Sequence, residues 1–132
     1  KKHSETIRSK GIEPVLFMTW PYKNKPEMQQ KLEKEFFKAS ELNNIRMIPA
    51  GQAFLYINQN FPNINLYTED LRHPSKEGTY LASLMVFTFL SNKSPIGNTY
   101  IIDLEPDVAE ILQKVAWMTY KNFQKRTLNS GL

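Results

Sequence analysis

Two short apolar runs are the strongest limit on how this chain can fold. The first is Val15–Met18, within a predicted strand over residues 12–20, and the second is residues 45–48. The first run is unbroken, and the second is interrupted only by Arg46. Apolar runs of this length are typical of strands that are buried on both faces of a parallel sheet. Because helical patterns alternate with these two runs, the sequence predicts an α/β fold.

Five segments have the apolar spacing or the end signals of helices. Gly11 ends the first, because glycine suits the left-handed backbone that follows many helices. Ser75 can cap the fourth by accepting backbone N–H groups. The fourth segment is apolar on nearly every side, so we expect it to be mostly buried. The predicted helices cover residues 1–10, Pro26 to Leu42, 52–58, 76–90, and the segment that begins at Pro106.

Two strands are too few for a stable parallel sheet, since each strand leaves one edge without a hydrogen-bonded neighbour. The chain also begins inside a predicted helix. We therefore expect residues 1–132 to form a single partial domain, the C-terminal part of a larger α/β domain, in which residues 98–132 are a helical extension. The remaining strands are expected from an N-terminal segment or from a partner chain.

The composition excludes several classes of protein. The 17 Lys and Arg residues exceed the 13 Asp and Glu residues, for a formal net charge of +4, but they are scattered, so no nucleic-acid surface is predicted. The absence of cysteine excludes disulfides and thiolate metal sites. The longest apolar stretch, residues 80–90, is about half of what a membrane helix needs, so no membrane span is predicted. No cofactor and no metal site are predicted either.

The chain has two histidines, and their surroundings differ. His3 lies near the chain terminus, where a solvated side chain is expected. His73 follows Asp70 by three residues in a polar loop, so the carboxylate can accept a hydrogen bond from Nδ1–H and leave Nε2 free as a base. Pro74 restricts the backbone of His73 to extended conformations. From the spacing alone, the simpler interpretation is that Asp70 and His73 are ordinary polar loop residues beside a helix cap.

The longer string around this pair resembles the last sequence block of the SGNH (GDSL-like) hydrolases. Residues 66–82, LYTEDLRHPSKEGTYLA, contain the pattern D-x-x-H-P-[ST]-x-x-G, and an apolar helix follows it. Residues 15–22, VLFMTWPY, are similar to a late core strand of that family, and residues 47–54, MIPAGQAF, are similar to its next strand. The resemblance covers roughly residues 10–97.

This resemblance implies a three-layer α/β/α fold with a parallel sheet, of which the chain would be the C-terminal portion. It implies an esterase or deacetylase with a Ser-Asp-His triad, in which His73 is the base and Asp70 orients it. The family's serine and oxyanion residues belong to earlier blocks that this chain lacks, and Ser75 suits a helix cap better than a nucleophile. We therefore expect the chain alone to be inactive. The implied substrate is an ester-type small molecule or an acylated carbohydrate.

Trp20 and Tyr22 follow the first apolar run. Because ligands of open α/β sheets bind beyond the carboxyl ends of the strands, these rings are candidate substrate-binding residues. Large aromatic side chains more often pack in a core, which is the simpler interpretation. A second function also fits the sequence: a non-catalytic α/β interaction module that keeps the Asp70–His73 pair as a relic of its fold.

Overall fold

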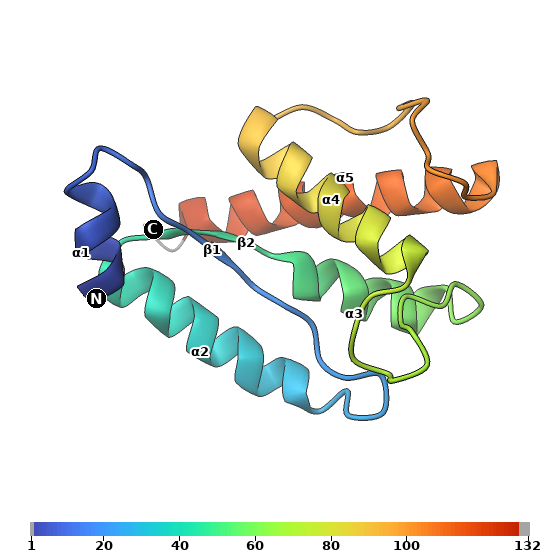
Figure 1. Ribbon diagram of the computed structural model, residues 1–132, viewed down its shortest axis with the longest axis horizontal. Helices are drawn as coiled ribbons and strands as arrows, with labels where there is room; N and C mark the ends of the chain where they lie inside the picture. The colour runs from blue at the N-terminus through green and yellow to red at the C-terminus, as the bar shows by residue number, and fades with distance from the viewer. Residues whose placement is uncertain (1, 130–132) are drawn as a thin grey trace.

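The computed structural model describes residues 2–129, which form helices connected by loops around one small sheet (Figure 1). Lys1 and residues 130–132, which the sequence assigns to the first helix and to the C-terminal extension, lie outside the described residues. Helices and strands alternate as expected, so a small α/β fold is confirmed. The elements are α1 (Lys2–Arg8), β1 (Val15–Phe17), α2 (Met28–Asn43), β2 (Arg46–Ile48), α3 (Ala50–Asn60), α4 (Lys76–Ser91) and α5 (Pro106–Asn129).

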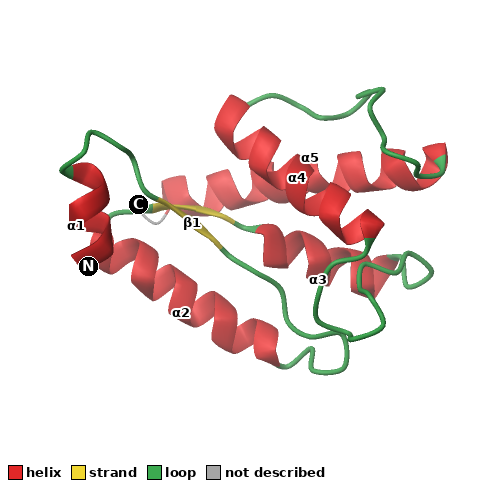
Figure 2. Ribbon diagram, viewed as in Figure 1, coloured by secondary structure: helices red, strands yellow, loops and turns green. Residues whose placement is uncertain are grey.

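β1 and β2 form a two-stranded parallel sheet, with Val15 opposite Arg46 and Phe17 opposite Ile48 (Figure 2). Within the described residues, the other edge of β1 has no hydrogen-bonded strand. Val15 and Phe17 are therefore only half-buried, and complete burial is reached at Met18, just beyond the strand. The apolar run of β1 predicted a strand whose side chains are buried on both faces of the sheet. Their burial is incomplete because the sheet has only two strands.

Apolar side chains nevertheless pack on both faces of the sheet. Because successive side chains of a strand point to opposite faces, neighbouring residues enter different clusters. Ile48 belongs to the main core, whereas Met47 belongs to a second cluster that contains Phe123 of α5. The partly buried residues of β1 follow the same alternation. Phe17 packs against the main core, whereas Leu16 packs against the second cluster.

The helix ends agree with the signals in the sequence. Gly11 follows α1 with φ of +72°, and Asn44 ends α2 in the left-handed conformation with φ of 48°. Ser75 caps α4, because its side chain accepts the N–H of Gly78 at 3.2 Å. α2 and α3 differ from their predicted ranges by a residue or two at each end, which is the usual uncertainty of helix boundaries.

The main core lies where α3, α4 and α5 pack against one another. α4 is buried along the side that contacts α5, but Phe87 and Leu90 are 44% and 67% exposed. The expectation that α4 is mostly buried therefore holds for one side only, since no described element covers the other. Central members of the core are Phe54, Ile57, Leu66, Leu81, Met85 and Leu112.

α5 belongs to the segment that the sequence assigns to a helical extension, residues 98–132. Its residues Leu112 and Ala116 are fully buried in the main core beside α3 and α4. This helix therefore contributes directly to the interior of the fold. Between residues 2 and 129, no helix combines the length and the apolar character that crossing a membrane requires.

Shortening Leu112 tests this role of α5. Leu112→Ala removes a fully buried side chain and leaves a cavity, so we expect the free energy of unfolding to fall by about 2–5 kcal/mol. Urea denaturation measures the change. Glu110→Ala, which removes one partner of the exposed ion pair with Lys114, is the control and should change stability by no more than about 0.5 kcal/mol. Equal effects of the two substitutions would show that α5 is not part of the core.

Candidate active site

The loop between α3 and α4 folds back on itself and carries its polar side chains at the tip. Tyr67 and Pro74 face each other as an isolated antiparallel bridge. The N–H of Thr68 donates to the His73 carbonyl at 2.9 Å, which closes the turn. Leu71, at the tip, has φ of 61°, in the left-handed region that few residues other than glycine, Asn and Asp adopt readily. The turn is therefore sharply defined.

The carboxylate of Asp70 is the centre of this turn. Its Oδ1 accepts hydrogen bonds from the hydroxyl of Thr68 at 2.8 Å and from the backbone N–H groups of Arg72 and His73, each at 2.9 Å. Its Oδ2 forms a hydrogen bond with Nδ1 of the His73 imidazole. Hydrogen bonds to the ionised form stabilise it. The bond to the His73 side chain, together with the other three, therefore holds the pKa of the Asp70 carboxyl well below its usual range.

The His73 side chain is 79% exposed, although its ring is fixed at one end by Asp70. Nδ1 is the nitrogen that the carboxylate holds, so the proton of a neutral imidazole is placed there and Nε2 carries the lone pair. Within residues 2–129, no group forms a hydrogen bond with Nε2. The arrangement can accept a proton from a hydroxyl group that approaches from outside the loop.

Trp20 connects this loop to the end of β1. Its Nε1–H donates to the Arg72 carbonyl at 3.1 Å, and its ring is stacked on Phe54, with centroids 3.9 Å apart and an interplanar angle of 3°. The N–H of Lys23 donates to the carbonyl of Leu71 at 2.9 Å. The loop after β1 and the loop before α4 consequently lie side by side, at the carboxyl end of the strand (Figure 1).

Tyr67 forms a second connection between the same two loops. Its hydroxyl donates to the Pro21 carbonyl at 3.0 Å and accepts a hydrogen bond from the Asn58 side chain at 3.1 Å. Burial raises the pKa of Tyr67, so the phenol stays a donor. The Asn65 side chain accepts from Nζ of Lys23 at 2.8 Å and donates to the Tyr67 carbonyl at 2.8 Å.

The two aromatic residues predicted to bind substrate lie in different surroundings. Trp20 is half-buried and engaged with the loop and the core, as described above. Tyr22 is half-buried beneath the Arg72 guanidinium, whose central carbon lies 4.9 Å from the ring centroid. Tyr22 also lines a pocket of about 300 Å³, of which neither Asp70 nor His73 is a lining residue.

The start of α4 is held against the loop by a glycine and a serine of the D-x-x-H-P-S-x-x-G string. A Cβ atom on Gly78 would lie 2.2 Å from the carbonyl oxygen of Leu66, so no larger residue fits without displacing backbone. Ser75, the helix cap, also has its hydroxyl 2.7 Å from the Asn65 carbonyl. The pattern of residues that resembles a catalytic block therefore also has a structural explanation.

Three residues of this site were not identified from the sequence. Thr68 supplies a hydroxyl donor to Asp70, Asn65 bridges the two loops, and Leu71 takes the left-handed turn position. Thr68 could have been found, because a hydroxyl two residues before an acidic side chain is typical of local side-chain turns. No local signal identifies Asn65 or Leu71.

Comparisons with known proteins return no relative for this chain. No family model matches it, and no curated protein and no solved structure is significantly similar to it. In the described part of the chain, no group of three or more His, Asp or Glu side chains is arranged to hold a metal ion.

Gly78→Ala tests the close approach of α4 to the loop. The added methyl group would overlap the Leu66 carbonyl, so we expect a loss of about 1–3 kcal/mol in stability. Thr79→Ala, at the next and exposed position of α4, is the matched control and should stay within about 0.5 kcal/mol. Thermal and urea denaturation measure both variants. A Gly78→Ala protein as stable as the control would contradict the close contact between Gly78 and Leu66.

The lowered pKa of Asp70 predicts a specific dependence of stability on pH. In the folded protein this pKa lies below its ordinary value of 3.8, so ionised Asp70 stabilises the fold fully above about pH 5. The stabilisation is lost as the pH falls below the unfolded-state pKa and through the folded-state pKa. Asp70→Asn lacks this ionisation. The difference in Tm between the wild type and Asp70→Asn should therefore shrink from pH 6 to pH 2.5, and a constant difference would contradict the prediction.

Proposed function

We propose that this chain supplies the Asp-His pair of a Ser-Asp-His triad in an SGNH-type serine hydrolase that cleaves an ester bond. The observation that carries the proposal is the hydrogen bond from Nδ1 of His73 to the Asp70 carboxylate, with Nε2 left unengaged by any described residue. The D-x-x-H-P-S-x-x-G string of residues 70–78 adds support from the sequence. From the same resemblance, we take the substrate to be an ester-type small molecule or an acylated carbohydrate.

In the proposed reaction, Nε2 of His73 accepts the proton of the serine hydroxyl as the serine oxygen attacks the ester carbonyl. The Asp70 carboxylate stabilises the imidazolium that forms. His73 then donates this proton to the leaving alcohol, and the acyl group stays on the serine. Water next gives a proton to His73 as it attacks the acyl group, and the free acid leaves when the proton returns to the serine.

The serine and the oxyanion donors are proposed to lie outside residues 1–132, in another segment or another chain. Ser75 is a poor candidate, because its hydroxyl lies 2.7 Å from both the Asn65 carbonyl and the Glu77 carboxylate and accepts the N–H of Gly78. A nucleophile needs a free hydroxyl and donors for the developing oxyanion. The chain contains no Gly-Asp-Ser string that could present another serine in the family's manner.

The unpaired edge of β1 is where the proposed additional strands would join the sheet. Parallel strands are stable when both edges are hydrogen-bonded and both faces are covered. Helices already cover apolar side chains on each face of the sheet, as the two clusters around Ile48 and Met47 indicate. This packing supports the proposal that the complete fold has three layers, with a parallel sheet between helices.

His73→Ala in the complete protein that contains this chain tests the proposed base. With p-nitrophenyl acetate as substrate, we expect kcat/KM to fall by about 10³-fold or more, since the serine would lose its proton acceptor. Asp70→Asn should also lower kcat strongly, because it removes the negative charge that stabilises the imidazolium. His3→Ala, at the only other histidine of the chain, is the control and should leave kcat/KM within about twofold.

Two outcomes of this experiment would count against the proposal. Activity that His73→Ala leaves unchanged would show that the imidazole is not the base. A complete protein that neither hydrolyses p-nitrophenyl acetate nor reacts covalently with a fluorophosphonate, a reagent for activated serines, would instead favour the non-catalytic interaction module.

A further inference from the structure

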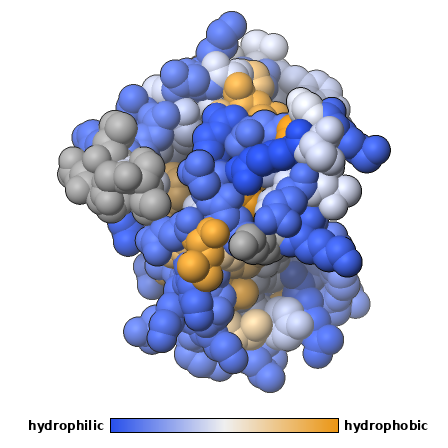
Figure 3. All heavy atoms as spheres, turned by 90° about the vertical axis from the view of Figure 1, so that its left-hand side faces the viewer, coloured by the Kyte–Doolittle hydropathy of each residue, from blue (hydrophilic) through white to orange (hydrophobic). Residues whose placement is uncertain are grey.

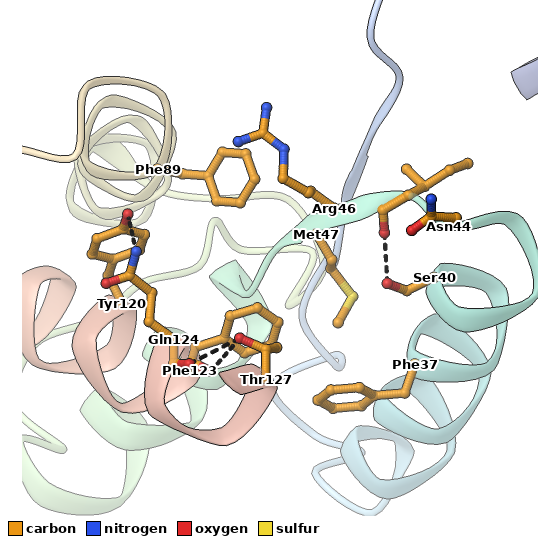
Figure 4. Close-up of a pocket in the computed structure, with 11 residues that line it drawn as sticks. Phe37, Ser40, Asn44, Arg46, Met47, Phe89, Tyr120, Phe123, Gln124 and Thr127 are labelled. Atoms are coloured by element: carbon orange, nitrogen blue, oxygen red, sulfur yellow. Dashed lines mark hydrogen bonds between the residues drawn. The ribbon is translucent and has the colours of Figure 1, made fainter. Parts of the chain in front are cut away.

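A second pocket, of about 230 Å³, lies at the opposite end of the sheet from His73. It opens between β2 and the C-terminal parts of α2 and α5, and Arg46, the first residue of β2, is one of its lining residues (Figure 4). The α3–α4 loop adjoins the carboxyl end of β1 instead. Because β1 and β2 are parallel, the two sites are at different ends of the strands.

Aromatic side chains and a methionine form the walls of this pocket. Phe37 of α2 and Phe89 of α4 lie on opposite sides of it, with Met47 between them (Figure 4). Phe123 of α5 packs beside Phe37, with ring centroids 5.9 Å apart. Met47 is only 2% exposed, so the floor of the pocket is part of the second apolar cluster. Such walls suit the apolar body of a ligand.

The charge at the pocket is positive. None of the residues that line it is Asp or Glu. The Arg46 guanidinium lies over the Phe89 ring at 5.2 Å, and the Arg126 guanidinium lies over the Phe37 ring at 5.4 Å, so an arginine flanks each aromatic wall. In the described part of the chain, no carboxylate forms an ion pair with Arg46. An anionic ligand group would therefore find a cation that has no competing partner.

Several other polar side chains of the lining are already hydrogen-bonded within the protein. The Ser40 hydroxyl donates to the Ile45 carbonyl at 2.6 Å. Nε2 of Gln124 donates to the Tyr120 hydroxyl at 2.5 Å, and that hydroxyl donates to Asn92 at 2.9 Å. Among the residues that line the pocket, Arg46 is the one with a charged side chain, and its guanidinium can donate to an anionic group. This pattern favours a ligand with one anionic group and little other polarity.

We propose that this pocket binds a small amphipathic carboxylate. The apolar body lies between Phe37 and Phe89, and the carboxylate pairs with Arg46. At about 30 Å³ for each water-sized volume, the pocket of about 230 Å³ holds between seven and eight such volumes, which suits the apolar part of a short alkyl or aryl acid. The proposal does not depend on the hydrolase function.

The surface around this end of the molecule favours a small ligand over a protein partner. Seen from the side where α1 and the C-terminal ends of α2 and α5 lie, the described surface is mostly hydrophilic, with small separate apolar areas (Figure 3). Protein-binding sites usually expose a larger continuous apolar patch. Among the described residues, no continuous apolar patch of that kind is visible on this side (Figure 3).

Octanoate is the probe for a binding test by NMR, using protein labelled with ¹³C at the methionine methyl groups. We expect the Met47 methyl signal to shift with a dissociation constant of the order of 0.1–1 mM, typical of a ligand of this size. The signal of Met118, on another side of α5, should not shift. Octan-1-ol, which has the same chain without the charge, should bind about tenfold more weakly.

Substitutions of Arg46 separate charge recognition from simple apolar contact. Arg46→Gln should weaken octanoate binding about five- to tenfold and leave octan-1-ol binding unchanged, whereas Arg46→Lys should retain most of the affinity. Arg72→Gln is the matched control, because Arg72 is also exposed and also lies over an aromatic ring, but at the other end of the sheet. It should leave octanoate binding unchanged.

Three results would overturn the proposal. One is the absence of any Met47 shift at 10 mM octanoate. Another is equal affinity for octanoate and octan-1-ol together with no effect of Arg46→Gln, which would leave an unspecific apolar surface. The third is a shift of the Met47 signal with protein concentration in the absence of ligand, accompanied by dimer formation in light scattering, which would assign the pocket to a contact between two copies of the chain.

Discussion

The hydrogen bonds to the Asp70 carboxylate are the interaction on which the candidate site depends. One oxygen of this side chain gathers a hydroxyl and two backbone N–H groups of its own loop, and the other oxygen holds the imidazole of His73. Three local donors therefore fix the position of the carboxylate independently of the His73 imidazole. A carboxylate held in this way orients an exposed ring that would otherwise rotate freely.

The second constraint is the narrow sheet. A two-stranded parallel sheet has two unpaired edges. One of them belongs to β1, and this strand also leads into the candidate site, through Trp20. The helices on both faces give the strands apolar surroundings, yet Val15 and Phe17 stay half-buried because no described strand pairs with the other edge of β1. The proposed hydrolase accounts for both facts, because the nucleophile and the neighbouring strands would arrive together.

Much of this fold was predictable from local signals. The apolar runs indicated both strands, and Gly11 and Ser75 marked helix ends, because caps depend on a few adjacent residues. The pairing of Asp70 with His73 was also predictable, since the two residues are only three positions apart in the sequence. Three features could not be predicted, because each depends on contacts between residues distant in the sequence. They are the exposed side of α4, the contribution of α5 to the core and the bridging of the two loops by Asn65.

Trp20 has a consequence for how strand β1 and the α3–α4 loop influence each other. Its indole is both stacked on the core residue Phe54 and hydrogen-bonded to Arg72, the residue before His73, so it connects the end of the first strand to the loop that carries the imidazole. A further strand that paired with β1 and changed its twist would therefore also change the orientation of the His73 ring. Assembly of the sheet and orientation of the ring are in this sense coupled through Trp20, together with the Tyr67 hydroxyl and the backbone bond from Lys23 to Leu71.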